Sequence, residues 1–160
     1  MTKLLLSVHV LAAILVLGPI AVAASLFPRY ARRAGAGGPG GAGPQTGVLP
    51  LLHRICRGYA VAGVAVPVFG IATGARLGVL TDAWLVASLL LTALAAALLV
   101  LRILPAQERL LALAGEPADG AADPRPPLAA RLAGLTGAFN LLWAIVVVLM
   151  IVRPGSTTGA

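Results

Sequence analysis

The chain has 160 residues, of which 59% are hydrophobic and only 11% are charged. Soluble domains are typically about 45–50% apolar and about 25% charged, so this composition indicates an integral membrane protein. The net charge of +7 does not indicate nucleic acid as a partner, because the arginines flank apolar runs and no nucleic-acid-binding motif is present.

The first predicted span covers residues 4–26, which carry no formal charge and are long enough to cross about 30 Å of hydrocarbon. Gly18-Pro19 predicts a kink in its second half. A cleaved signal peptide is the alternative, since Lys3, the apolar stretch and Ala21-Val22-Ala23 imitate its three regions. The stretch exceeds the usual length of about 7–15 residues, and cleavage would translocate the arginines that follow. We therefore expect an uncleaved span.

A loop over residues 28–57 follows, and its Gly/Pro-rich part, residues 34–47, predicts a flexible linker. The second span covers residues 59–75, in a helix that begins near Leu51, and Pro67 should bend it. Gly70 and Gly74 are four residues apart, a spacing at which small residues let another helix approach closely. A short turn leads to the third span, residues 83–104, which starts beside the interfacial anchor Trp84.

The second long loop, residues 105–130, carries four carboxylates and can hold a short interfacial helix over 107–114. The carboxylate spacing matches no calcium loop, so a solvated surface is the expected reading. The fourth span covers residues 131–152 and contains Thr136, Asn140 and Trp143. The fold class is therefore all-α, a single membrane domain formed by a four-helix bundle.

The basic residues predict the orientation of this bundle. Nine of the twelve lie in or beside the two long loops: Arg29, Arg32, Arg33, Arg54, Arg57, Arg102, Arg109, Arg125 and Arg131. The other three, Lys3, Arg76 and Arg153, lie on the opposite side. The positive-inside rule then predicts an up-down-up-down bundle with both termini outside and both long loops in the cytoplasm. The bias toward Ala, Gly, Arg, Val and Pro suggests a bacterial cell membrane.

His9 is the candidate functional residue, because an ionisable side chain placed within a membrane span is a functional hypothesis by default. At 1.5 Å per residue it lies about 7 Å below the outer boundary. The same arithmetic places Thr73, Ser88 and Thr92 near that depth, so we expect a small polar cluster around His9. Asn140 should lie deeper. His53 belongs to the opposite interface, on the order of 20 Å or more away, and Met150 is a possible soft ligand.

The segment Val8-His9-Val10-Leu11-Ala12-Ala13 resembles the start of a bacterial membrane family, domain of unknown function 2269. A histidine in the first span is also similar to the copper-resistance D-type proteins and the membrane type of protoporphyrinogen oxidase. The latter resemblance implies haem binding at His9. Gly18-Pro19 replaces the Trp and Gly pair that those proteins tend to carry, so the oxidase reaction is not carried over.

Two functions follow from these observations. The first is a structural or accessory bundle without catalytic activity and with no cofactor, whose partners are the lipid bilayer and a homo-oligomer or larger membrane complex. The second is a haem- or copper-binding redox protein that uses His9, with Thr73, Ser88 and Thr92 around it. A small-molecule carrier is a third class, which a continuous polar cavity would identify.

Overall fold

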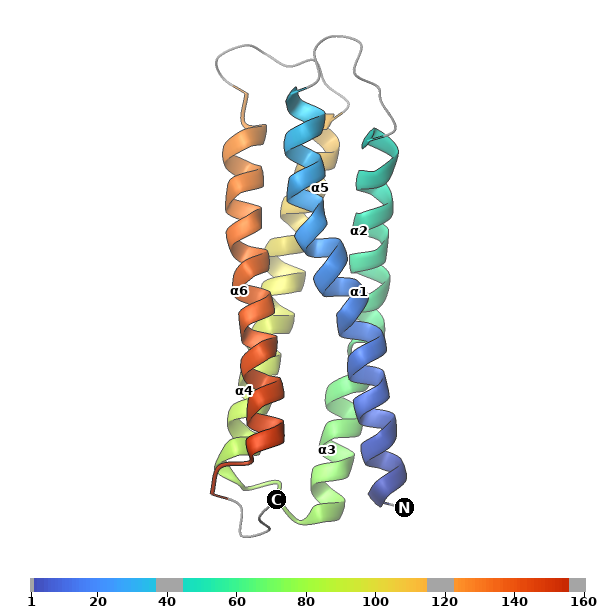
Figure 1. The fold of residues 1–160 in the computed structure, drawn as a ribbon, viewed down its shortest axis with the longest axis vertical. Coiled ribbons are helices and arrows are strands. Elements are labelled where there is room, and N and C mark those ends of the chain that lie inside the picture. The colour runs from blue at the N-terminus through green and yellow to red at the C-terminus, as the bar shows by residue number, and fades with distance from the viewer. Residues whose placement is uncertain (1, 37–44, 115–122, 156–160) are drawn as a thin grey trace.

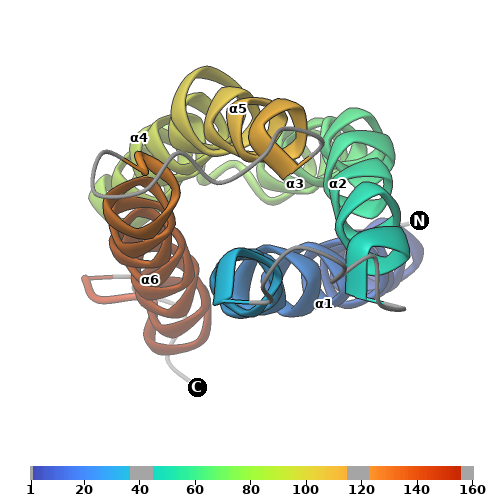
Figure 2. The ribbon, with the colours of Figure 1, turned by 90° about the horizontal axis from the view of Figure 1, so that it is seen from above.

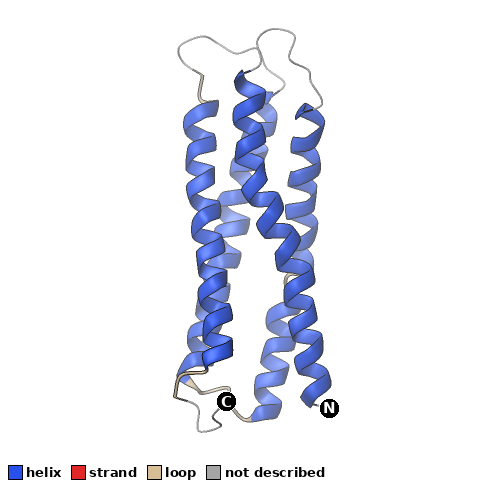
Figure 3. Cartoon of the chain, in the orientation of Figure 1, coloured by secondary structure: helices blue, strands red, loops and turns tan. Residues whose placement is uncertain are grey.

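The computed structural model describes residues 2–36, 45–114 and 123–155, and its elements are helices that form four long rods (Figures 1 and 3). The first rod is α1 (Thr2–Ala36) and the last is α6 (Arg125–Val152). The second consists of α2 (Gln45–Ala62) and α3 (Ala65–Leu77). The third joins α4 (Ala83–Leu98), a π-helical turn η1 (Leu99–Ile103) and α5 (Leu104–Ala114) without a gap.

All four rods are long and apolar enough to cross a membrane: Lys3–Ala34, Gly47–Leu77, Ala83–Ala114 and Arg125–Val152. In the most apolar 18-residue stretch of each rod, only 17–28% of the residues are buried inside the bundle. A soluble monomer rarely exposes apolar patches of this extent to water, whereas lipid is their natural solvent. The helices also run past the predicted spans, since residues 28–36, 47–57 and 105–114 are helical. Hydropathy marks the hydrocarbon thickness and not the end of a helix.

The second rod is interrupted at Gly63-Val64, four residues before the proline that predicts a bend. Pro67 has no backbone N–H, so the Gly63 carbonyl cannot receive its usual i+4 donor. The N–H of Val66 donates to that carbonyl instead, at 3.1 Å. This tight turn satisfies the carbonyl, and it separates α3 from α2.

Another proline explains the π-helical turn, which the sequence analysis did not anticipate. Pro105 is the second residue after η1 and lacks the N–H that would continue the α-helical pattern. The N–H of Leu104 instead reaches back five residues to the Leu99 carbonyl. The helix therefore accommodates the proline with one widened turn and continues to Ala114.

The two ends of the bundle are packed differently. Thr2 and Val152 lie at one end, here called the terminus end, and Ala36, Gln45, Ala114 and Arg125 lie at the other, the loop end (Figure 1). Seen from above, the rods surround a central axis (Figure 2). Most of the buried apolar core lies toward the loop end, around Phe27, Leu52, Ile103 and Leu132. Toward the terminus end α3 packs extensively against α1 and makes a smaller contact with α4.

Asp123 lies just before α6, and its carboxylate binds Arg125, the first residue of that helix. Its carboxylate accepts hydrogen bonds from the backbone N–H of Arg125 at 3.0 Å and from the Arg125 Nε at 2.8 Å. These bonds hold the pKa of Asp123 below its usual value. A carboxyl group whose pKa is lower in the folded state stabilises that state above its unfolded pKa, and the gain disappears as the pH falls through the folded pKa.

We therefore predict that Asp123→Asn lowers the thermal midpoint of the detergent-solubilised protein at pH 7. The difference between the wild type and the variant should begin to shrink below about pH 4, the ordinary pKa of an aspartate, and should vanish only after the pH has fallen through the lower pKa of folded Asp123. A difference that stays constant from pH 7 to pH 2 would contradict the proposed role of the charge.

Candidate functional site

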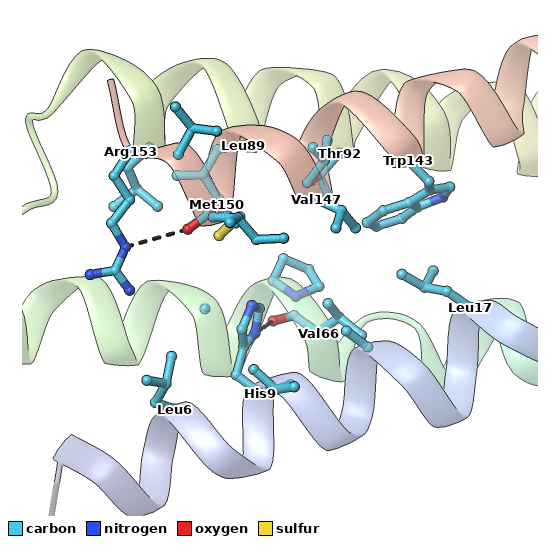
Figure 4. Close-up of a pocket in the computed structure, with 18 of the residues that line it drawn as sticks. Leu6, His9, Leu17, Val66, Leu89, Thr92, Trp143, Val147, Met150 and Arg153 are labelled. Atoms are coloured by element: carbon cyan, nitrogen blue, oxygen red, sulfur yellow. Dashed lines mark hydrogen bonds between the residues drawn. The ribbon is translucent and has the colours of Figure 1, made fainter. Parts of the chain in front are cut away.

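A cavity of about 950 Å³ occupies the terminus end of the bundle, between α1 and α3 on one side and α4 and α6 on the other (Figure 4). Its lining is mainly aliphatic, with His9, Thr92, Trp143, Met150 and Arg153 as the exceptions. Small-molecule sites have volumes of about 300–1,000 Å³ and combine apolar walls with a few polar groups. This cavity matches that description and contains the candidate residue His9.

The His9 side chain rises from α1 and forms a hydrogen bond between its Nδ1 and the backbone carbonyl of Val66 on α3, at 2.9 Å. A carbonyl oxygen only accepts, so Nδ1 must carry the proton. In a neutral imidazole the other nitrogen, Nε2, then carries a lone pair. Figure 4 shows the second ring nitrogen of His9 directed into the cavity, toward the side where α6 lies. His9 therefore presents an acceptor or metal ligand to whatever occupies this space.

Gly70 makes this position of the imidazole possible. It lies one turn after Val66 on α3, and a Cβ added there would be only 2.9 Å from Cε1 of His9 and 3.3 Å from Nδ1. The missing side chain gives the ring room to reach the Val66 carbonyl. Gly74 plays a comparable part toward α4, because its Cβ would be 2.8 Å from Cδ2 of Leu85. The structure thus places both predicted packing glycines at close helix contacts.

Met150 of α6 and Arg153, the residue that follows α6, complete the cavity opposite His9. Met150 lines it with its thioether (Figure 4), and Arg153 lines it at the terminus end. Arg153 has a left-handed backbone, with φ of 44°, and its Nε donates to the Met150 carbonyl at 3.3 Å. Its guanidinium carbon lies 5.6 Å from the centre of the Trp84 ring, within the range of a cation–π contact. A fixed positive charge therefore borders an otherwise apolar space.

The hydroxyl groups expected around His9 take other partners. Thr73 donates to the Phe69 carbonyl at 2.7 Å, Ser88 to the Trp84 carbonyl at 2.8 Å and Thr92 to the Ser88 carbonyl at 2.7 Å. Each bond stays within its own helix, as is common for Ser and Thr in helices. Thr92 shares the cavity wall with His9, whereas Thr73 and Ser88 are buried in helix contacts.

Trp143 lines the cavity, and Asn140 precedes it by three residues on α6, outside the cavity lining. The Asn140 amide donates to the Ser25 hydroxyl at 3.0 Å, which joins α6 to α1. Among the described residues, the Asn140 Oδ1 and the Trp143 Nε1 are buried without a hydrogen-bond partner. One is an acceptor and the other a donor, so each needs a partner such as a water molecule or a ligand.

A second polar group, which sequence reasoning missed, lies near the loop end. The fully buried Gln107 of α5 accepts from His53 Nδ1 at 3.0 Å and donates to the Cys56 sulfur at 3.6 Å. His53 Nε2 is 3.7 Å from a carboxylate oxygen of Glu108. Spacing alone offered a signal, because His53 and Cys56 are three residues apart and share one face of a helix. The described residues contain no cluster of three or more His, Cys, Asp or Glu that could hold a metal ion.

Comparison with known proteins gave no relative: no family model, no curated protein and no solved structure matches this chain.

We predict that Gly70→Ala destabilises the protein by about 1–3 kcal/mol, the usual cost of overpacking, because the new methyl group displaces the His9 ring. Thermal unfolding in detergent measures this, with Gly58→Ala as the control, since a Cβ at Gly58 meets nothing within 4 Å. In a His9→Ala background the cost of Gly70→Ala should largely vanish. An equal cost with and without the imidazole would show that the ring does not lie against Gly70.

Proposed function

We propose that this chain is a membrane protein that binds haem in the terminus-end cavity, where Nε2 of His9 would hold the iron. One observation carries the proposal: the Val66 carbonyl accepts from Nδ1 of His9, which leaves the lone pair of Nε2 facing a large apolar cavity. Metal-ligating histidines commonly donate their other ring nitrogen to a carbonyl or carboxylate, which fixes the tautomer and the ring orientation. This arrangement favours a binding protein over a purely structural bundle.

The donor set favours haem over a bare copper or zinc ion. Within the described cavity wall, His9 and Met150 are the side chains with suitable donor atoms. A bare ion bound by two such donors would lack the three or four protein ligands that copper and zinc sites use. The porphyrin ring brings its own nitrogen ligands, so one histidine, or a histidine and a methionine, is sufficient.

The remaining wall suits the rest of the haem molecule. The aliphatic side chains of the four rods provide an apolar surface for the ring, and the fixed Arg153 charge at the terminus end suits its carboxylate groups. Bound haem would supply one-electron transfer. The residues of this chain would hold the ring, set the His9 tautomer and exclude water.

The test is an absorption spectrum of the protein purified from haem-replete cells. The proposal predicts a Soret band with about one haem per chain, lost in His9→Ala and retained in the matched control His53→Ala. Met150→Leu should keep the band and change its position if the thioether is the second ligand. A colourless, metal-free wild type would contradict haem binding and leave the structural bundle as the function.

We further propose an up-down-up-down bundle in a bacterial cytoplasmic membrane, with both termini outside. The nine basic residues in or beside the two long loops support this orientation. Reporter fusions at residues 40 and 118 should both indicate the cytoplasm, and a fusion after Ala160 should indicate the outside. Any other pattern would refute this topology.

A further inference from the structure

We propose that the loop end carries a specific site for an anionic phospholipid, in a groove between the third rod and α6. Two adjoining hollows form this groove, and both are lined by Arg109, Leu128 and Arg131. One of them extends to Arg102, which lies about two helical turns before Arg109 on the third rod. Three guanidinium groups from two helices therefore surround one concave surface.

The charges of this groove have no counterpart nearby among the described residues. None of the three arginines forms an ion pair there, and all are exposed. The two described carboxylates at this end are engaged elsewhere: Glu108 faces His53 of α2, and Asp123 pairs with Arg125 at 2.8 Å. The groove is thus a concentrated positive site, and it suits a ligand with a phosphate group.

The rest of the lining identifies the ligand as a lipid rather than a soluble phosphate. Pro105, Leu128, Leu132 and Leu135 line the narrower hollow, while Leu113, Pro124 and Pro127 line the wider one. Apart from the buried Leu132, these side chains are at least partly exposed, and they belong to rods that are apolar enough to span a membrane. An acyl chain can follow this surface while its phosphate stays level with the arginines. Basic pockets between transmembrane helices are known to take acidic headgroups in this way.

The depth of the arginines agrees with this placement. Arg102 and Arg109 are seven residues apart, about 10 Å along a helix axis. Long arginine side chains reach from such depths to the headgroup level. A phosphate held between Arg102, Arg109 and Arg131 would neutralise the charge of Arg102, the deepest of the three, at the edge of the hydrocarbon.

Native mass spectrometry of the purified chain, with equal amounts of dioleoylphosphatidylglycerol and dioleoylphosphatidylcholine, tests the site. We expect the wild type to retain the anionic lipid over the zwitterionic one by about tenfold or more, since each arginine near the headgroup level adds on the order of fivefold. The variant R102Q/R109Q/R131Q should lose this preference. R29Q/R32Q/R33Q, which changes three exposed arginines at the same end of α1, should keep it.

A lysine variant and a competition experiment distinguish a lipid site from general surface charge and from a site for free phosphate. R102K/R109K/R131K changes the same three positions but keeps the charge, and it should retain most of the preference for the anionic lipid. If it does, a loss of binding in the glutamine variant reflects the lost charge and not unfolding. Free glycerol phosphate should not displace the lipid. Equal losses in both glutamine variants would reduce the effect to general surface charge, and displacement by glycerol phosphate would identify a phosphate site without a lipid. Either result overturns the proposal.

Discussion

The hydrogen bond between His9 and the Val66 carbonyl is the interaction on which the terminus end of this bundle depends. Between helices in lipid there is no hydrophobic driving force, so packing and interhelical hydrogen bonds decide which helices stay together. Such a bond is worth about 0.6–2 kcal/mol. Here it links the first rod to α3, the segment that the Pro67 break separates from α2. The link holds α3 against α1, α3 meets α4 in a smaller contact that includes Gly74 and Leu85, and the cavity lies between these helices and α6.

One polar contact thus accounts for both the shape of the site and its chemistry. Gly70 lets the ring approach, the carbonyl fixes the proton on Nδ1, and Nε2 is left to face the cavity. The loop end shows the opposite arrangement. Its core is closely packed around Phe27 and Leu132, its buried polar side chains satisfy one another, and its charges lie on the outer surface. We accordingly propose different ligands for the two ends, one inside the bundle and one on its surface.

Much of the architecture could be predicted from the sequence, because the bilayer imposes simple rules. Apolar length identified four spans, and Pro67 and the glycines Gly70 and Gly74 identified a bend and close contacts. The partners of individual polar groups could not be predicted in this way. Ser and Thr can bond to their own helix as well as to a neighbour, and only the rotation of the rods decides between these choices. The π-helical turn sets that rotation for Gln107, so its pairing with His53 was missed. The cavity could not be predicted either, since it depends on how α3 packs against α1 and α4.

The position of the proton on the His9 ring decides whether the hydrogen bond to Val66 exists. In protein labelled with ¹⁵N-histidine only two rings contribute, and His53→Asn assigns them. At neutral pH without added haem, we expect a protonated Nδ1 and an unprotonated Nε2 for His9. Added haem should then shift the Nε2 resonance and leave the proton on Nδ1. A His9 ring with its proton on Nε2 would contradict the hydrogen bond to Val66, and with it the proposed ligand site.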